Sequence, residues 1–460
     1  MEKKGIMIVK RTNDLTVGNP IKGILIFMIP IIFGNVFQHM YNLVDTVIVG
    51  HILGEEALAA VGATSALYGF FTSMAFGMTN GYSIVIARFF GGRDEKGVKR
   101  SLAHTVMLTI ISSAVLTLIG VVFARPLLTL LQTPQEIIEL SYSYVIVVLS
   151  CLLVSMLYNM FAGMLRGIGN SLMPLVFLII STVCNAILDV VFVGYIGMGV
   201  AGAAWATVLA QLISVFSSLI YVWKKCPTLH VSKSDFKWNA IIAEDLFTNG
   251  ISMALMFSIV SIGSIALQSA INSLGSITIA AHTAARKIGE MFMMFFTPLS
   301  MAGSTYCSQN LGAGKKDRIP QGMRACFVVG FTAAAFVNLI TFLAAEPILI
   351  AVTGSHNMEL IQTSALYLHI NLPFYFALTI LLTLRSALQG LGHKLIPLLA
   401  SVIELVSKFV VASLLVPHIG YLGVCIVEPL VWVICAILVF TDYKLLMRKM
   451  KKQELGNTVS

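Results

Sequence analysis

Twelve long apolar stretches dominate the sequence between Ile24 and Met447. Each stretch is long enough to cross a lipid bilayer as a helix, which takes about 20 residues. Of all residues 57% are hydrophobic and 11% are charged, whereas a soluble globular protein has about 25% charged residues. The chain is therefore predicted to be an all-α integral membrane protein. The expected spans are 24–50, 57–86, 102–124, 138–162, 173–196, 200–223, 246–272, 278–306, 323–345, 359–384, 396–417 and 421–446.

The basic residues lie almost entirely on one side of these spans. When both termini and every second loop are assigned to one side, that side holds 26 of the 30 Lys and Arg residues, with Arg166 and Arg385 counted in its loops. Lys and Arg accumulate in the cytoplasmic loops of membrane proteins. We therefore expect a protein of the inner (cytoplasmic) membrane with an even number of spans and both termini in the cytoplasm. The net charge of +9 then reflects this asymmetry and predicts no nucleic-acid partner.

From the composition of the N-terminal segment we expect no cleaved signal peptide. The basic N-terminal segment lacks a short apolar run followed by a small-residue cleavage site. The first helix is expected to direct insertion into the membrane itself.

The chain repeats itself after 221 to 223 residues. Leu165-Arg-Gly-Ile-Gly-Asn-Ser-Leu-Met-Pro174 returns as Leu388-Gln-Gly-Leu-Gly-His-Lys-Leu-Ile-Pro397, and Leu58-Ala-Ala returns as Ile279-Ala-Ala. This offset covers six spans, an even number, so the halves are expected to be parallel repeats, an organisation found in secondary transporters. The predicted parts are a cytoplasmic N-terminal segment 1–23, an N-lobe 24–223, a cytoplasmic linker 224–245, a C-lobe 246–446 and a cytoplasmic tail 447–460.

The usual signatures of enzymes and resident metals are missing from the sequence. The seven cysteines show no CxxC or Cys/His spacing, and the histidines show no H-x-x-x-H pattern. Gly312-Ala-Gly-Lys-Lys316 lacks the G-x-x-x-x-G-K-[ST] spacing of a phosphate-binding loop. We expect neither an enzyme, nor a cofactor, nor a metal beyond a possible Na⁺.

Acidic side chains inside the first half form a candidate cation site. Ionisable groups are costly within a membrane and mark functional sites. Asp45 lies deep in the first span, while Asn185 and Asp189 share a face of the fifth. With Thr207 of the sixth span they form a set of oxygen ligands suited to Na⁺. Two interpretations compete with this one: a proton carrier formed by the two carboxylates, and plain hydrogen bonding within the bundle.

The second half departs from this pattern at the corresponding positions. Lys408 stands where the repeat would place Asn185, and Ala412 where it would place Asp189. Glu404 precedes Lys408 by four residues, the favoured order for a helical ion pair. We predict a structural pair, with a gating or substrate role as the alternative.

Other polar and flexible residues within the spans are candidates for a substrate cavity. Carboxylates there are suited to cationic substrates, and Met side chains to varied apolar ligands. The competing interpretation is a structural ion pair for Arg286 and Glu290, and hydrogen bonding to backbone groups freed near Pro429 for Glu428. For the methionines it is packing against lipid. The candidates are Gln38, Tyr41, Met253, Met256, Arg286, Glu290 and Glu428.

Several motifs resemble one family of membrane transporters. Tyr41-Asn-Leu-Val-Asp-Thr-Val-Ile-Val-Gly50, Leu165-Arg-Gly-Ile-Gly169 and Gly199-Val-Ala-Gly-Ala-Ala204 recur in order at the appropriate spans. In these motifs the chain resembles the multidrug and toxic compound extrusion (MATE) transporters of bacteria from about Asn19 to Lys444.

The resemblance implies two six-helix lobes around a central cavity and export of drug-like, often cationic compounds by Na⁺ or H⁺ antiport with alternating access. It implies a cation site at Asp45, Asn185 and Asp189, completed by Thr207 and Asn159. Ser258 and Leu378 stand where other members have acidic residues, so we expect no C-lobe cation site of that kind. We expect a monomer in contact with lipids. A lipid-linked saccharide or lipid flippase of a related superfamily is the alternative, although such proteins often have about fourteen spans.

Overall fold

The protein folds into long helices in a computed structural model that describes residues 13–272 and 274–459. The described residues contain no β-strand. The first half contains α1 (Pro20–Leu53), α2 (Glu55–Gly91), α3 (Glu95–Leu130), α4 (Ile138–Ser150), α5 (Leu152–Gly167), α6 (Leu172–Asp189), the π-helical turn η1 (Val190–Tyr195) and α7 (Gly199–Lys225). The second half contains α8 (Ala240–Asn272), α9 (Ser276–Gly312), α10 (Arg318–Thr353), α11 (Met358–Asn371), the 3₁₀ turn η4 (Leu372–Phe374), α12 (Tyr375–Gly390), α13 (Leu395–Ile419) and α14 (Tyr421–Val459).

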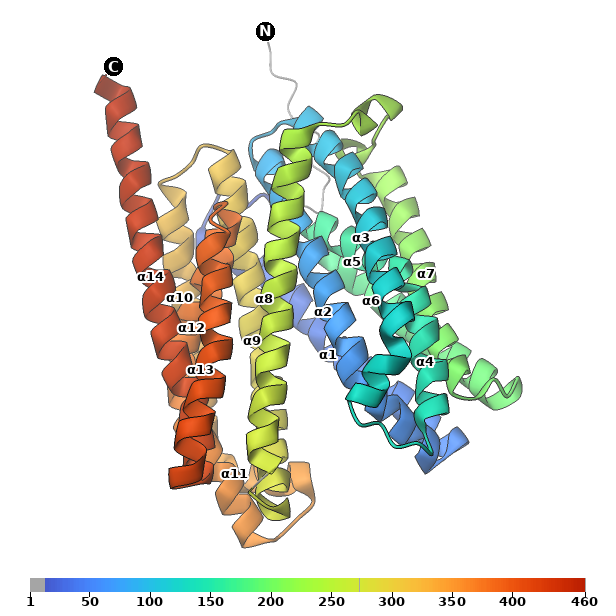
Figure 1. The fold of residues 1–460 in the computed structure, drawn as a ribbon. Coiled ribbons are helices and arrows are strands. Elements are labelled where there is room, and N and C mark those ends of the chain that lie inside the picture. Colours follow the sequence, from blue (N-terminus) through green and yellow to red (C-terminus); the bar gives the residue numbers. More distant parts are fainter. Residues whose placement is uncertain (1–12, 273, 460) are drawn as a thin grey trace. The chain divides into compact units, whose positions relative to one another are not determined.

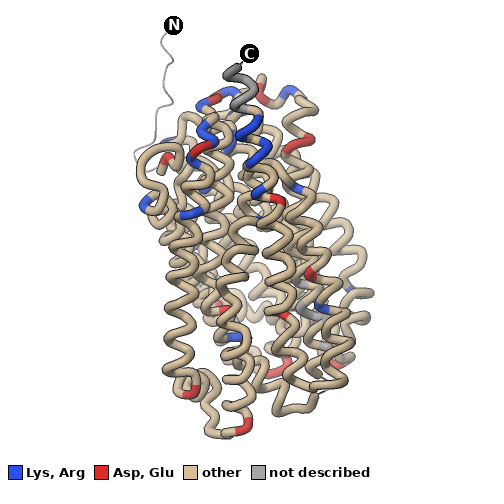
Figure 2. The backbone as a smooth tube through the Cα atoms, turned by 90° about the vertical axis from the view of Figure 1, so that its left-hand side faces the viewer, with Lys and Arg blue, Asp and Glu red and all other residues tan. Residues whose placement is uncertain are grey.

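These helices account for twelve membrane spans. Among the described residues ten segments are long and apolar enough to cross a bilayer, one of which comprises α11 and α12. The pair α4 and α5, bent by 51° around Cys151, makes an eleventh. The twelfth is α9, which has 37 residues but carries Arg286, Lys287 and Glu290 and is therefore more polar. Charged residues gather near the helix ends and are sparse along the middle of the helices (Figure 2). The protein is a multi-pass membrane protein, as the sequence predicts.

The structure divides into two compact units, each a bundle of long helices (Figure 1). Among the described residues the first unit contains 13–14 and 29–255, and the second contains 15–28 and 256–459. One division falls within α8, after Leu255, and the segment 224–245 belongs to the first unit. The lobe and linker boundaries proposed from the sequence stay a prediction.

Matching contacts occur in both units at positions related by the repeat. In the first unit the Ser141 hydroxyl donates to the Ala60 carbonyl at 3.1 Å. In the second unit the Ser364 hydroxyl donates to the Ala281 carbonyl at 2.9 Å. Serine hydroxyls thus join the same pair of helices in each repeat, α4 to α2 and α11 to α9. The parallel repeat predicted from the sequence is therefore visible as repeated packing.

The segment between α7 and α8 contains two short 3₁₀ turns, Pro227–Leu229 and Lys233–Phe236. The backbone N–H and the hydroxyl of Ser232 both donate to the Asp235 carboxylate, at 2.8 and 2.7 Å. These bonds lower the pKa of that carboxyl below its usual value. A capping box thus orders the second turn of the linker, while Cys226 and Leu229 at the first turn pack into a hydrophobic cluster of the first unit.

Helices α2 and α8 approach closely where α2 carries glycines. A Cβ atom added at Gly81 would lie 2.5 Å from the Asn249 carbonyl oxygen, and one added at Gly77 would lie 2.6 Å from the Ala254 Cα. Small residues permit such close packing of membrane helices.

We expect Gly81→Ala to destabilise the first unit by about 1–3 kcal/mol, because the new methyl group collides with backbone that has no free space. The matched control is Gly62→Ala in the same helix, where an added Cβ meets no atom within 4 Å. Thermal unfolding of the purified protein in detergent should show a lower midpoint for Gly81→Ala and an equal or higher midpoint for Gly62→Ala. Equal midpoints for the two variants would contradict this account of the α2–α8 contact.

Candidate ion site and cavities

Two carboxylates, one buried and one half-buried, meet in the first unit. Asp45 lies in the second half of α1, and Asp189 is the last residue of α6. The two carboxylates lie close enough to interact directly. Asp189 is 0% exposed. Among the described residues neither of its carboxylate oxygens, nor Oδ1 of Asp45, has a hydrogen-bond partner. Apart from the nearby neutral amide of Asn185, the described residues therefore do little to balance the charge of the pair.

Asn185 and Thr207 lie beside this pair. The Thr207 hydroxyl accepts hydrogen bonds from the Tyr41 hydroxyl at 3.0 Å and from the Asn185 amide at 3.5 Å. Asn185 also lies near the Asp189 carboxylate, one helical turn away. The structure thus brings Asp45, Asn185, Asp189 and Thr207 together. It adds Tyr41, proposed from the sequence as a cavity residue, to the same cluster.

The helix carrying Asp189 changes its winding directly after this residue. Val190–Tyr195 forms a π-helical turn, in which the Ile196 N–H donates to the Val191 carbonyl at 2.9 Å. Such turns are rare and are frequently found at functional sites. Apart from the nearby Gly194, Gly197 and Gly199, no feature of the sequence predicts this turn.

The chemistry available to this cluster follows from its charge. Two adjacent carboxylates in a buried site repel each other, and burial without a partner is costly for each. A proton shared by the pair, or a small cation bound by their oxygens, removes that cost. The residues present therefore suit a site that takes up a monovalent cation.

The remaining predicted ligand, Asn159, lines a separate cavity. Its amide donates to the Ser155 carbonyl at 2.9 Å. This cavity of the first unit has a volume of about 260 Å³ and also contains Gln38. Its other lining residues are Pro30, Ile31, Gly34, Asn35, Phe76, Tyr158, Ala162, Arg166, Pro174, Leu175 and Leu178.

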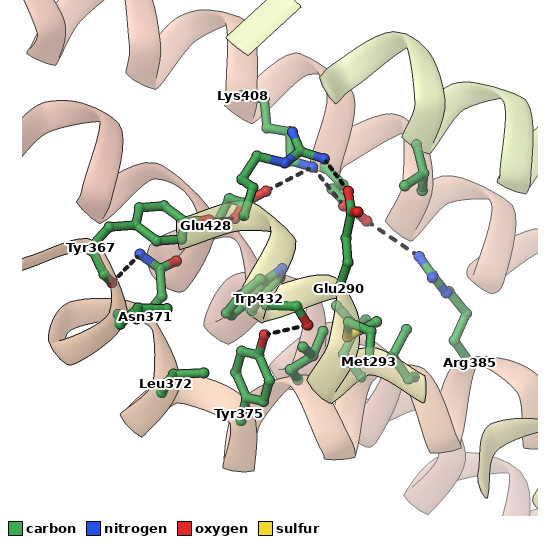
Figure 3. Close-up of a pocket in the computed structure, with 18 residues that line it drawn as sticks. Glu290, Met293, Tyr367, Asn371, Leu372, Tyr375, Arg385, Lys408, Glu428 and Trp432 are labelled. Carbon is green, nitrogen blue, oxygen red and sulfur yellow. Dashed lines mark hydrogen bonds and ion pairs between the residues drawn. The ribbon is translucent and has the colours of Figure 1, made fainter. Parts of the chain in front are cut away.

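The second unit contains a cavity of about 210 Å³ lined by charged and aromatic side chains (Figure 3). Three predicted cavity residues, Arg286, Glu290 and Glu428, line it together with Lys408 and Glu404. Its aromatic walls are Tyr367, Tyr375 and Trp432, and Met293 adds a thioether. Arg385 also lines the cavity, so its carboxylates and cationic side chains balance in number, and the aromatic faces are the feature that suits an organic cation.

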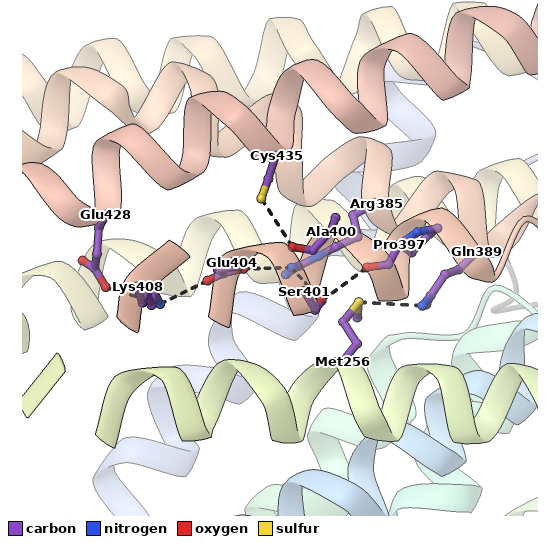
Figure 4. A network of polar contacts seen from close by, with 10 residues as sticks. All are labelled: Met256, Arg385, Gln389, Pro397, Ala400, Ser401, Glu404, Lys408, Glu428 and Cys435. Atoms are coloured by element: carbon purple, nitrogen blue, oxygen red, sulfur yellow. Dashed lines mark hydrogen bonds and ion pairs between the residues drawn. The ribbon is translucent and has the colours of Figure 1, made fainter. Parts of the chain in front are cut away.

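A chain of ion pairs runs along one side of this cavity (Figure 4). Lys408 Nζ lies 3.1 Å from Glu404 Oε1 and 3.8 Å from Glu428 Oε1. The second oxygen of Glu404 lies 3.3 Å from Arg385 Nη1. The Tyr367 hydroxyl donates to Glu428 Oε2 at 2.5 Å. The predicted pair of Glu404 and Lys408 is thus part of a longer network.

The prediction that Arg166 and Arg385 lie in loops is wrong. Arg166 lies in the last turn of α5, and Arg385 lies within α12 and is 7% exposed. Both helices continue beyond the apolar windows because other helices supply polar partners for these side chains, Asn80 for Arg166 and Glu404 for Arg385. Hydropathy alone contains no information about such partners.

The two proposed methionines lie outside both cavities. Met253 belongs to the first unit and is 7% exposed. Met256 belongs to the second unit, is 2% exposed, and its sulfur accepts from the Gln389 amide at 3.7 Å. Both side chains are buried among their neighbours, and their role as cavity residues stays a prediction.

The ion-site cluster and the charged cavity occupy corresponding places in the two repeats. By the repeat offsets Thr207 corresponds to Glu428, Asn185 to Lys408, and Tyr144 to Tyr367. Tyr144 interacts electrostatically with both Asp45 and Asp189, as Tyr367 does with Glu428. The second unit thus holds the ammonium group of Lys408 where the first unit offers oxygen atoms.

Comparison with a family model identifies the chain. A model described as MatE matches residues 30–191 and again residues 252–414, once in each half. The chain belongs to the MatE family. This result confirms both the resemblance to multidrug and toxic compound extrusion transporters and the duplication, and it makes the protein a membrane transporter of that family.

Several MatE relatives match over most of their length. The chain is 26% identical over 439 residues to "Probable multidrug resistance protein YoeA" of Bacillus subtilis, covering 92% of this chain and 93% of the relative. It is 25% identical to "Probable multidrug resistance protein NorM" of Thermotoga maritima, covering 87% of each. A solved structure described as "Crystal structure of MATE in the bent conformation" matches with a TM-score of 0.90 at 24% identity, covering 98% of this chain and 99% of that one.

Proposed function

We propose that this MatE protein exports organic, often cationic compounds by antiport with Na⁺ or H⁺, using alternating access. The observation that carries the proposal is the pair of adjacent carboxylates, Asp45 and Asp189, of which three buried oxygens have no hydrogen-bond partner among the described residues. The names of the curated relatives, which refer to multidrug resistance, support the choice of substrate class.

In this proposal the coupling ion binds in the first unit only. Asp45, Asp189, Asn185 and Thr207 would supply its oxygen ligands or proton acceptors. In the second unit the corresponding place is filled by Lys408, whose ammonium group lies near Glu404 and Glu428. The ammonium group of Lys408 takes the place that a second ion from solution would otherwise occupy. One coupling ion per transport cycle is the expected consequence.

The cavity of the second unit is proposed as a contact site for the substrate. Glu290 is the carboxylate there with the weakest internal pairing, since its ion pair with Arg286 spans 3.8 Å and its side chain is 59% exposed. Tyr375 and Trp432 provide aromatic faces, which attract cations.

Ion binding drives export only if the ion binds one conformation of the transporter more tightly than the other. The π-helical turn after Asp189 is the element most directly attached to the ion site, and we propose that it changes winding when the ion binds. By the positive-inside rule the protein lies in the cell membrane with both termini in the cytoplasm, and we propose that it acts as a monomer.

Export from proteoliposomes tests this function. Wild-type protein is reconstituted, ethidium is the reporter, and inward Na⁺ and pH gradients are imposed separately. We expect one of the two gradients to drive ethidium transport and the other to have little effect. Protein-free liposomes are the control for leakage. Transport at the same rate with both gradients collapsed would overturn the antiport mechanism.

A further inference from the structure

The cavity of the first unit contains one charged side chain among polar and aromatic neighbours. Arg166 projects from the last turn of α5 into a lining that includes Tyr158 and Asn159 from its own helix and Asn35 and Gln38 from α1. A permanently charged guanidinium is costly within a membrane domain, so its presence requires a compensating partner or a function.

Arg166 has no anionic partner in the part of the chain that the structure describes. Its Nη2 donates to the Asn80 amide oxygen at 3.2 Å. Among the described residues it forms no ion pair, and Tyr158 is the titratable group that interacts with it electrostatically. One neutral amide satisfies one of the five guanidinium N–H donors. The charge and most of the donors therefore remain available to a ligand in the cavity.

Arg385 of the second unit shows what a purely structural arginine does in this fold. It is also buried in a helix beside a cavity, but its Nη1 lies 3.3 Å from Glu404 Oε2 and 3.4 Å from the Ser401 hydroxyl. By the repeat, Arg166 itself corresponds to Gln389, which is neutral. A charge without a carboxylate is thus a feature of the first-unit cavity and is not required by the shared scaffold.

We propose that this cavity binds the anionic group, a carboxylate or phosphoryl, of an amphiphilic organic ligand through Arg166. The planar guanidinium can form two parallel hydrogen bonds to such a group. The phenol of Tyr158 and the amides of Asn35 and Gln38 surround it with further polar atoms, and Phe76 and Leu178 offer apolar contact. The substrates of the proposed exporter would then include anions and zwitterions as well as cations. It rests on the proposed function only in treating the ligand as a transported substrate.

A matched pair of fluorescent probes tests the site directly. Dansylglycine carries a carboxylate, and dansylglycinamide replaces it with a neutral amide on the same fluorophore. Binding is measured by dansyl fluorescence to the full protein in phosphatidylcholine nanodiscs, with empty nanodiscs subtracted. We expect the wild type to bind dansylglycine about tenfold more tightly than the amide, the effect of one charge-assisted contact.

Variants of Arg166 assign that difference to the cavity. Arg166→Gln should bind both probes equally, and Arg166→Lys should keep part of the preference. The matched control is Arg125→Gln, because Arg125 is an exposed residue paired with Glu139 and should leave the preference unchanged. No preference in the wild type, or a full preference in Arg166→Gln, would overturn the proposal. If Arg166→Gln does not fold, the wild type and Arg166→Lys still decide it.

A lipid headgroup and a soluble solute would present the same anionic chemistry. Adding phosphatidylglycerol to the nanodiscs distinguishes the two sources. If the site takes a lipid headgroup, this anionic lipid competes and weakens the binding of dansylglycine, whereas a site for a soluble solute binds dansylglycine with unchanged affinity. Either result supports an anionic ligand and identifies its source. Ethidium export under the imposed gradients is measured separately. Loss of gradient-driven export with the probe preference intact would refute the antiport function and leave the anion site standing.

Discussion

Asp189→Asn is expected to reduce gradient-driven export of ethidium strongly while leaving the protein folded. The asparagine side chain has nearly the same shape but neither carries charge nor exchanges a proton, so the ion loses its main ligand. If ion binding supplies a typical coupling free energy of about 1–3 kcal/mol, the gradient-driven rate should fall by roughly 5–150-fold. Initial rates in proteoliposomes, normalised to the amount of reconstituted protein, measure the effect.

Stability separates this loss of coupling from unfolding. The Asp189 carboxylate is fully buried and its oxygens have no hydrogen-bond partner among the described residues. Replacing it by a neutral amide removes a buried charge, so the thermal midpoint should stay equal or rise. Asp235→Asn, in the segment between α7 and α8, is the matched control and should transport normally. A folded Asp189→Asn protein with wild-type gradient-driven export would refute the proposed role of this residue.

Much of the fold was predictable because its signal is local. Each span is recognisable from its own run of apolar residues, and the motifs of the first half recur in the same order in the second half. The break between α4 and α5 was not visible, because Cys151 and its neighbours are as apolar as a continuous helix. The division within α8 depends on which helices each part of α8 contacts, and no single segment encodes such contacts.

The candidate ion site was predictable for the same local reason. Asn185 and Asp189 are four residues apart on one helix, so their shared face follows from helical geometry. The hydrogen bond from Tyr41 to Thr207 joins residues 166 positions apart. It could not be derived without the packing of α1 against α7. The role of Asn159 as a ligand stays a prediction, since this residue lines the other cavity of the first unit.

The ion network of the second unit shows the limit of pairwise rules. The four-residue spacing of Glu404 and Lys408 predicted their pair, and the distance between Nζ and Oε1 is 3.1 Å. The same rule gave no indication that Arg385 and Glu428 extend the pair from two other helices. Arg385 follows a largely apolar run, and Gln389 stands four residues after it. This spacing places both residues on one face of α12.

Lys408→Met is expected to destabilise the second unit by about 3–5 kcal/mol, the cost of removing one partner from a buried ion pair. Lys408 is 3% exposed and lies between two carboxylates. After its removal Glu404 keeps Arg385 at 3.3 Å, whereas Glu428 keeps the neutral hydroxyl of Tyr367 at 2.5 Å and the weaker electrostatic interaction with Arg286. The uncompensated charge therefore falls on Glu428. Thermal unfolding in detergent should show a clearly lower midpoint.

The double variant Lys408→Met, Glu428→Gln tests that assignment. It removes the cation together with the carboxylate that depends on it, and leaves Arg385 and Glu404 as a balanced pair, so most of the lost stability should return. Lys449→Met, at an exposed position of α14, controls for the substitution itself and should leave the midpoint unchanged. If the double variant is no more stable than Lys408→Met, Glu428 does not bear the uncompensated charge. Recovery would instead mean that Lys408 neutralises Glu428 in the folded protein, as an ion from solution is proposed to neutralise Asp45 and Asp189 in the first unit.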